Sequence, residues 1–503
     1  MPVLVRIALR NLLEHKAKTI IVGAIVAVGI AVLIVGESFT AASAMGVRRL
    51  FIDNYTAHVM VSGIADGPIS LFGVQSPGAV QETPVIPDYE KVRAHVEGIP
   101  GVAAVTPQIS GYARMRYRDY PGWAFSLLFG IEPQSYRRLF DNISFVEGRD
   151  LRPGEAGILL STERVAELKT QVTARALRDQ GKDPAVEIHV GDTIRLTSFG
   201  YIGIKIREVP IVGIFQFKQA SEGVGIDLIS YVDVETLRAL RGLTLGSRGG
   251  YTLRESETAL LAMDNVEDIF AKGGATIEEA GVSGKLTDRK LRDILGDTAA
   301  RQEALKQDVG AWNYLLIKLD NPRQADRLMG GLNDWFVANG LAAHAGTWQA
   351  AAGPFSTTAD VIRTVFTIAV IILGIVALII IMNTLVISVL ERTGEIGTMR
   401  ALGARKGFVW RMFLYETLVI CVVFGLLGIL LSVVAVGIVN LLRVPATNVF
   451  LRIIFGGAEL HPTVGVVSIL VALGVVVMIG FLGNLYPVSI ALRIPAVRAM
   501  HTE

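Results

Sequence analysis

The sequence is poor in cysteine, in charge and in recognisable catalytic motifs. Cys421 is the single cysteine among 503 residues, which excludes an internal disulfide framework and a cysteine-based metal site. Charged residues make up 19% of the chain, against about 25% in soluble domains, and 51% are hydrophobic. The net charge of +2 leaves no basic excess that would favour nucleic acid as a partner. These shortages argue against a wholly soluble enzyme.

Nucleotide and catalytic signatures are also missing. The two Gly-Lys pairs, at 181–182 and 284–285, have neither the upstream glycine nor the following hydroxyl of a phosphate-binding loop. The seven histidines are scattered, with no His-Glu-x-x-His pattern for a metal. The Gly281-Val282-Ser283-Gly284 sequence falls short of a nucleophile elbow. We therefore predict no catalytic residues, no metal and no cofactor bound by this chain.

Four long uncharged segments are present instead. They cover residues 19–36, 364–390, 417–442 and 463–492, and the first alone would reach roughly 27 Å as a helix. We predict four transmembrane helices. For the first, the basic residues before it and Ala42-Ser43-Ala44 after it leave a cleaved signal peptide as the alternative. Its length and the helical sequence that continues to Phe51 favour a retained anchor.

The distribution of lysine and arginine predicts the orientation. Segments 1–18, 391–416 and 491–503 hold eleven, whereas the short loop 443–462 holds two, so both termini are expected in the cytoplasm of a bacterial inner membrane. The expected divisions are a cytoplasmic amphipathic segment 1–18, a first span with its outward extension 19–51, a periplasmic domain 52–355, a stalk and second span 356–390, a cytoplasmic coupling loop 391–416, a third span 417–442, a short periplasmic loop 443–462, a fourth span 463–492 and a cytoplasmic tail 493–503.

The large outer segment is predicted to be an α+β domain of two lobes. Short strands bounded by proline and glycine are expected at 57–62, 102–117, 157–160, 193–197, 209–215 and 314–319, with helices at 88–98 and 162–180. Residues 233–310 are charged and rich in glycine, and are interpreted as a helical insertion. Thr357 with Asp360 is expected to cap the helix that enters the second span.

Within the spans, Gly23, Ala27 and Ala31 form a small-residue stripe that would permit close helix packing; ordinary glycine and alanine content is the alternative. Asn383 is one of the few polar residues there, and such residues more often make helix-to-helix contacts than bind substrate.

The loop between spans two and three is the richest stretch. As a helix it would place Ile396, Met399 and Leu402 on one side, with Glu395 and Arg400 adding charge beyond it. Such a helix suits the groove of a cytoplasmic partner, or it lies on the lipid surface.

Several motifs resemble those of the FtsX-like permease family, the membrane subunits of macrolide-exporter and lipoprotein-releasing ABC transporters. They are Asn383-Thr384-Leu385, the run from Glu391 to Ala404 (ERTGEIGTMRALGA), Glu416, the tail residues Pro487, Ala491, Pro495 and Ala499, the opening Ala8-Leu9-Arg10-Asn11-Leu12, and the outer segments 129–133, 147–149 and 190–192. The insertion 233–310 departs from a compact member.

This resemblance implies a dimeric permease, built from two copies or two homologous chains, that works with a separate ATPase carrying ATP and magnesium. The coupling residues would be Glu395, Ile396, Met399, Arg400, Leu402 and Gly403. We expect the substrate to be a lipoprotein or another amphiphile taken from the outer leaflet, with a periplasmic carrier or adaptor as a further partner. Val28, Phe366 and Asn383 are the candidate cavity residues. The alternatives are drug or peptide efflux through an outer-membrane duct, and signalling to a cell-wall hydrolase.

Overall fold

The computed structural model describes residues 16–74, 82–180, 185–200, 203–218, 229–245, 306–391, 394, 397–399, 402–447, 451, 455 and 459–493. The chain folds into two compact units. A helical unit comprises residues 1–52, 219–224 and 354–503, and a sheet unit comprises 53–218 and 225–353.

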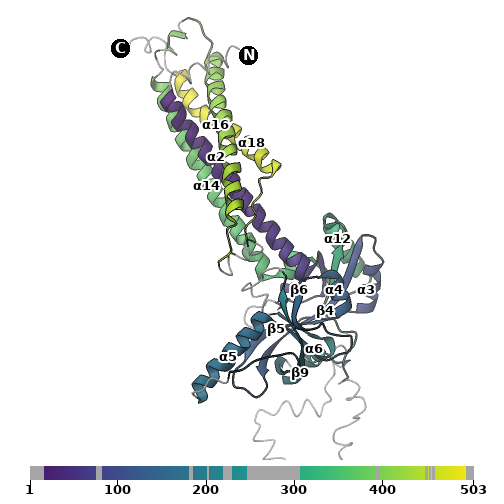
Figure 1. Cartoon of the computed structure of the whole chain (residues 1–503). Helices are drawn as coiled ribbons and strands as arrows, with labels where there is room; N and C mark the ends of the chain where they lie inside the picture. Colours follow the sequence, from purple (N-terminus) through teal and green to yellow (C-terminus); the bar gives the residue numbers. More distant parts are fainter. Residues whose placement is uncertain are drawn as a thin grey trace, which may run out of the picture. The chain divides into compact units, whose positions relative to one another are not determined.

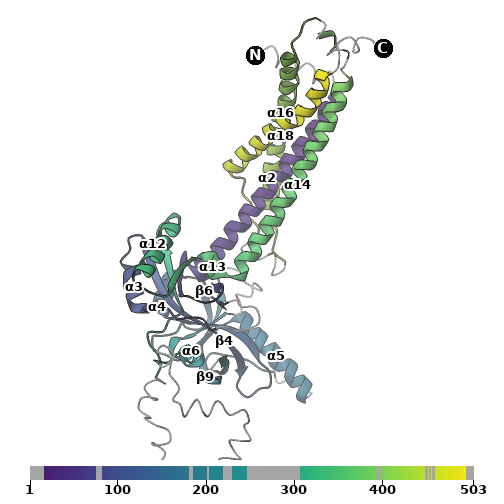
Figure 2. The ribbon, with the colours of Figure 1, turned by 180° about the vertical axis from the view of Figure 1, so that it is seen from behind.

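The helical unit is built from four long helices that run side by side (Figure 1 and Figure 2). They are α2 (Lys16–Phe51), α14 (Pro354–Glu391), α16 (Lys406–Leu442) and α18 (Val466–Arg493). Within the described residues, Thr19–Thr56 and Lys406–Leu442 are long and apolar enough to cross a membrane, and the shorter apolar stretches Thr364–Ile380 and Val466–Leu482 lie in α14 and α18.

The start of α14 corrects one expectation. Thr357 was predicted to cap this helix, but the helix begins at Pro354, so Thr357 lies inside it. Proline is well suited to the first turn of a helix, because its ring fixes φ and its missing N–H would have no partner there. The Asp360 carbonyl instead accepts a hydrogen bond from the Thr364 hydroxyl, 2.9 Å away.

The sheet unit contains one ten-stranded sheet. Nine strands follow the order β12-β1-β11-β4-β5-β10-β7-β9-β6, and β8 pairs with β4 and β9. The strands are β1 (Val59–Gly63), β4 (Val102–Tyr117), β5 (Ala124–Ile131), β6 (Ile143–Gly148), β7 (Ile158–Ser161), β8 (Thr193–Gly200), β9 (Gly203–Phe217), β10 (Ile229–Asp233), β11 (Tyr314–Leu319) and β12 (Ala343–Thr347). The short strands β2 (Ile69–Ser70) and β3 (Gly73–Val74) form a separate hairpin.

The chain builds the first part of this sheet from residues far apart in sequence. In the order β12-β1-β11-β4 every neighbouring pair is antiparallel. Together with α3 (Tyr89–Glu97) and α12 (Ala325–Ala338), these strands form a β-α-β-β-α-β arrangement. The strands β5 to β10, which lie between β4 and β11 in sequence, form the rest of the sheet, so β4 is the strand that both parts share.

The second part of the sheet alternates parallel and antiparallel neighbours. Strand β10 is parallel to β5 and antiparallel to β7, and β9 is parallel to β7 and antiparallel to β6. The helices of this part are α4 (Pro133–Leu139), α5 (Thr162–Gln180) and α6 (Val234–Arg241), and α13 (Trp348–Ala352) closes the unit. The strands that the sequence predicted for two lobes therefore all belong to one hydrogen-bonded sheet.

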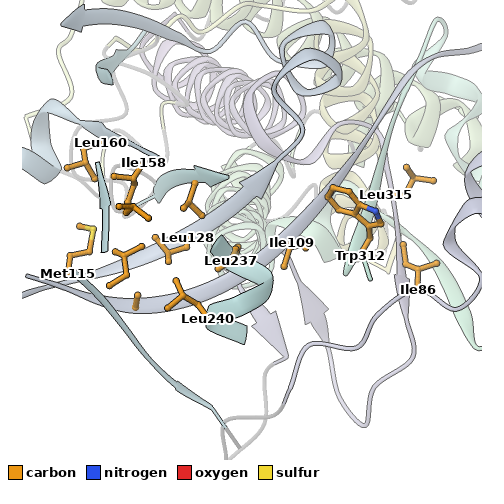
Figure 3. Close-up of a cluster of buried hydrophobic side chains, with 14 of the residues drawn as sticks. Ile86, Ile109, Met115, Leu128, Ile158, Leu160, Leu237, Leu240, Trp312 and Leu315 are labelled. Atoms are coloured by element: carbon orange, nitrogen blue, oxygen red, sulfur yellow. The ribbon is translucent and has the colours of Figure 1, made fainter. Parts of the chain in front are cut away.

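The main core of the sheet unit joins strands of both parts. Figure 3 shows Met115, Leu128, Ile158, Leu160, Leu237 and Leu240 toward one end and Ile86, Trp312 and Leu315 toward the other, with Ile109 between them. Leu128, Ile158 and Leu160 are fully buried. Burial of a side chain of this size contributes about 1.5–3 kcal/mol.

The ends of the predicted insertion are well defined. Asp233 caps α6 by accepting a hydrogen bond from the Thr236 amide at 2.8 Å, and Gly242 ends the helix with φ of 68°. Thr244 then pairs with Gln307 in an antiparallel bridge, and the Leu245 amide donates to the Lys306 carbonyl at 2.9 Å. The predicted helical content of residues 246–305 lies outside the described residues.

Candidate transmembrane cavity and coupling loop

Helices α2 and α16 approach each other through glycine. A Cβ atom on Gly428 would lie 2.5 Å from the Ala27 carbonyl oxygen and 2.9 Å from Ile30 Cβ. A Cβ atom on Gly23 would overlap the ring of Phe424. Small residues therefore bring these two helices close together, as is common where apolar helices associate in membranes. Ala27 is 2% exposed, and Ala31 is half-buried.

Glycines also mark the contacts of the other two helices. The Phe366 ring of α14 occupies the space where Gly36 of α2 has no side chain. In the pair of α16 with α18, Gly425 faces Val476 at 3.3 Å and Gly480 faces the Cys421 sulfur at 2.8 Å, both measured from the position of a Cβ atom. Every helix of the unit thus has at least one close contact made possible by glycine.

A cavity of about 410 Å³ lies among the four helices. Its lining comes chiefly from α2 and α14, with smaller contributions from α16 and α18, and is made of Ala24, Ile25, Val26, Val28, Gly29, Ile30, Val32, Leu33, Val370, Gly374, Val376, Ile380, Cys421, Val475 and Val476. No lining residue carries a formal charge. Such a cavity can hold apolar groups, each buried methylene contributing about 0.8 kcal/mol, but it offers no ionic recognition.

The three candidate cavity residues occupy different places. Val28 is part of the lining and is 58% exposed. Phe366 packs against Gly36 and is outside the lining, and Asn383 is exposed on α14 and also outside it. The sequence did not single out Cys421 or Val475, because a helix that is apolar on every side carries no periodic signal for the face that lines a cavity.

The coupling loop is described only in part. Glu395, Ile396 and Arg400 lie outside the described residues. Residues 397–399 are helical, and the chain then turns at Gly403, where φ is 97°. The Ala404 amide donates to the Met399 carbonyl at 3.0 Å, which is the outer hydrogen bond of a Schellman turn.

This turn determines which loop side chains face solvent. Gly403 adopts the left-handed conformation that favours glycine, and the helix ends there. Leu402 comes directly before it and is 90% exposed, whereas Met399 is half-buried. Of these two side chains, Leu402 is therefore the more accessible one.

Comparison with known proteins links both units to one family. A family model described as MacB-like periplasmic core domain matches residues 19–272, and one described as FtsX-like permease C-terminal matches residues 367–496. The first match alone covers half of the chain.

Curated relatives show the same similarity over short stretches. The macrolide export ATP-binding/permease protein MacB of Mannheimia succiniciproducens is 44% identical over 70 residues, which are 14% of this chain and 11% of that protein. The protein of the same name from Bordetella avium is 47% identical over 76 residues, 15% of this chain and 12% of that protein. The chain thus aligns with about a tenth of each relative's length.

Solved structures are similar over a larger share of the chain. The periplasmic region of MacB from Actinobacillus actinomycetemcomitans is 10% identical, with a TM-score of 0.29, over 63% of this chain and 95% of that one. The extracellular domain of the noncanonic ABC-type transporter YknZ is 12% identical, with a TM-score of 0.26, over 58% of this chain and 99% of that one. The two family models carry the assignment. The chain belongs to the MacB-type family of FtsX-like ABC transporter permeases, inner-membrane proteins with a large periplasmic α+β domain.

Proposed function

We propose that this chain is the permease subunit of a transporter that extracts lipoproteins or other amphiphiles from the outer leaflet of the inner membrane. It crosses the membrane four times, with both termini in the cytoplasm, and pairs with a second copy or a homologous permease. A separate ATPase hydrolyses ATP, and the motion passes from the coupling loop through the helices to the periplasmic unit.

The uncharged lining of the cavity among the four helices carries this proposal. An acyl chain in a cavity of about 410 Å³ is stabilised by every methylene it buries. The same stabilisation opposes release, so expulsion into an aqueous carrier requires an external source of energy. ATP hydrolysis supplies that energy. Polar substrates, in contrast, would leave their hydrogen-bonding groups without partners in this lining.

Photocrosslinking in growing cells tests the proposal. A photoreactive amino acid at Val28 lies in the lining, whereas one at Val434 of α16, which is 51% exposed and outside the lining, is the matched control. A third position, Phe366, reports on the region beside Gly36. We expect Val28 to capture lipoproteins in clear excess over Val434, as identified by mass spectrometry. Equal capture at both positions, or none at Val28, would contradict the proposal.

Efflux of a small amphiphilic drug is the second candidate. The curated relatives carry macrolide export in their names, and an apolar cavity also suits a drug of mixed polarity. Deletion of this chain would then increase sensitivity to macrolides while the localisation of lipoproteins stays unchanged. Lipoproteins held back in the inner membrane after deletion would instead support the first candidate.

A further inference from the structure

The sheet unit contains a second, chemically different hollow, which we call the arginine groove. It has a volume of about 860 Å³ and is lined mainly by residues of β4, the start of β5 and α5. Strand β4 contributes Arg114 and Arg116, and α5 contributes Arg175 and Arg178. Its volume is within the range of known ligand sites, and its lining is polar, unlike that of the transmembrane cavity.

The wall of the groove is held in place by a glycine contact. Gly122 has φ of 120°, and a Cβ atom on it would lie 2.8 Å from the carbonyl oxygen of Gln171 in α5. The turn before β5 therefore rests directly on the helix backbone, in a conformation that favours glycine. This contact fixes the position of Trp123, the next residue, relative to α5.

Two large aromatic side chains are left open to solvent in the groove. Trp123 is 48% exposed and Phe125 is 46% exposed. The Arg114 guanidinium lies over the Trp123 ring, 4.1 Å from its centroid, and Phe125 stacks on Tyr112 at 5.7 Å. Tryptophan and arginine side by side in a hollow are typical of the residues that dominate binding energy at protein interfaces.

The groove also has an excess of positive charge. Four arginines line it against two carboxylates, and both carboxylates are already paired, Glu167 with Arg164 at 2.5 Å and Asp179 with Arg175 at 2.8 Å. Among the residues that the structure describes, Arg178 forms no ion pair. Its charge is thus available to an incoming anion.

Arg116 is a second guanidinium of the groove that forms no direct ion pair with a described residue. Its guanidinium donates to the carbonyl oxygens of Tyr120 and Asp119, at 2.8 and 3.1 Å, and it has no carboxylate partner in the described part of the chain. It lies directly opposite Arg195 on β8, whose own charge is balanced by Glu208.

We propose that the arginine groove binds an extended acidic segment of a partner protein. Arg114 and Arg116 are two residues apart on one face of β4, so they repeat every ~7 Å, which is also the repeat of alternate side chains on an extended peptide. Aspartate or glutamate at alternate positions would match both guanidiniums, whose planar forks suit carboxylates. A compact anion such as phosphate would leave the exposed aromatic rings uncovered. This proposal does not depend on which substrate enters the transmembrane cavity.

Binding of a designed peptide to the full-length chain in neutral lipid nanodiscs tests the proposal. The probe is a fluorescein-labelled peptide of alternating aspartate with serine and tyrosine between, and the control peptide has asparagine in place of aspartate. Fluorescence anisotropy at physiological salt should show that the aspartate peptide binds at least about ten-fold more tightly. Arg178→Glu should weaken binding of the aspartate peptide about ten-fold, since a charge-assisted contact becomes a repulsion.

A matched variant and a competitor make the test decisive. Arg323→Glu reverses an exposed charge in the other part of the sheet unit, outside the groove, and should leave affinity unchanged. Arg178→Lys should retain most of the binding. Equal affinity for the two peptides, no binding of either, or an equal loss from Arg178→Glu and Arg323→Glu would overturn the proposal. Displacement of the peptide by millimolar inorganic phosphate would overturn it in favour of a site for small anions.

Discussion

Gly428 of α16 lies directly against Ala27 of α2, with its Cβ position 2.5 Å from the Ala27 carbonyl oxygen. A larger side chain there would force the two helices apart. We predict that Gly428→Leu destabilises the helical unit by about 1–3 kcal/mol, the usual effect of overpacking. Gly437→Leu, in the same helix, is the matched control, because no atom lies within 4 Å of the position that a Cβ atom on Gly437 would take. Thermal unfolding of the purified proteins in detergent should show a loss only for Gly428→Leu.

The exposed leucine in the coupling loop should matter for the ATPase rather than for folding. Leu402 is 90% exposed, so Leu402→Asp should insert normally but lose the ATPase subunit, because a charge buried at that interface would have no partner. Leu402→Met should keep the ATPase subunit bound, because methionine is apolar and of similar size. Co-purification and ATPase coupling measure both variants, and a Leu402→Asp complex with full coupling would show that this side chain does not dock. Met399→Asp should likewise abolish transport.

Topology can be tested with cysteines introduced at very exposed positions. Val337 in α12 is 82% exposed and Leu402 is 90% exposed, whereas the native Cys421 is 1% exposed and should react little. The charge distribution predicts that a membrane-impermeant maleimide labels Val337→Cys in cells with a permeabilised outer membrane. Leu402→Cys should react only after the inner membrane is opened. Labelling of Leu402→Cys from the periplasm would reverse the predicted orientation.

The bridge between Thr244 and Gln307 predicts that the intervening segment can be removed. Leu245 and Lys306 already share a backbone hydrogen bond, so an Asn-Gly turn in place of residues 246–305 should connect them as a hairpin. The free energy of unfolding, measured by thermal unfolding, should rise by up to about 3 kcal/mol, because two residues replace sixty and each halving of a connection lowers the entropic cost of closing it by about 0.6 kcal/mol. As a control, a deletion that starts at Leu240 removes a side chain that is 1% exposed and should prevent folding.

His189 should make stability depend on pH. Hydrogen bonds to Glu187 and Glu147 raise the pKa of this imidazole above its ordinary value of 6.5. Because this pKa is raised in the folded state, the stabilisation of the fold by protonated His189 is complete below pH 6.5. It is lost as the pH rises through the higher pKa of the folded state. His189→Gln should therefore lower the melting temperature more at pH 5.5 than at pH 8.5. An equal change at both values would show that protonation is not involved.

Sequence patterns predicted local elements better than their assembly. The helix expected at 162–180 and the strand expected at 102–117 are present with those bounds, since both have clear apolar periodicity and end at glycine, proline or turn residues. Strands β5, β6, β10 and β12 and the short strands β2 and β3 were not predicted. Strands β6 and β10 pair only with strands far away in sequence, and β10, whose pattern is nearly all buried, lacks the alternation that identifies a half-exposed strand.

The candidate cavity was likewise predicted only in part. The apolar spans and the exposed loop were visible in the sequence, but the position of the cavity depends on how helices pack. Val28 lies in its lining while Phe366 fills the space beside Gly36, and nothing in two uniformly apolar helices distinguishes these faces. The arginine groove was not identified either, because its residues come from a strand and a helix separated by about fifty positions.

Strand β4 has a mechanical consequence for the periplasmic unit. Its sixteen residues extend for about 53 Å, and its first half bonds to β11 while its second half bonds to β5 and β8. No flexible joint separates the two halves, since they share an unbroken strand. A pull on either end of β4 is therefore resisted by backbone hydrogen bonds along its whole length, and we expect the two parts of the unit to move and unfold together.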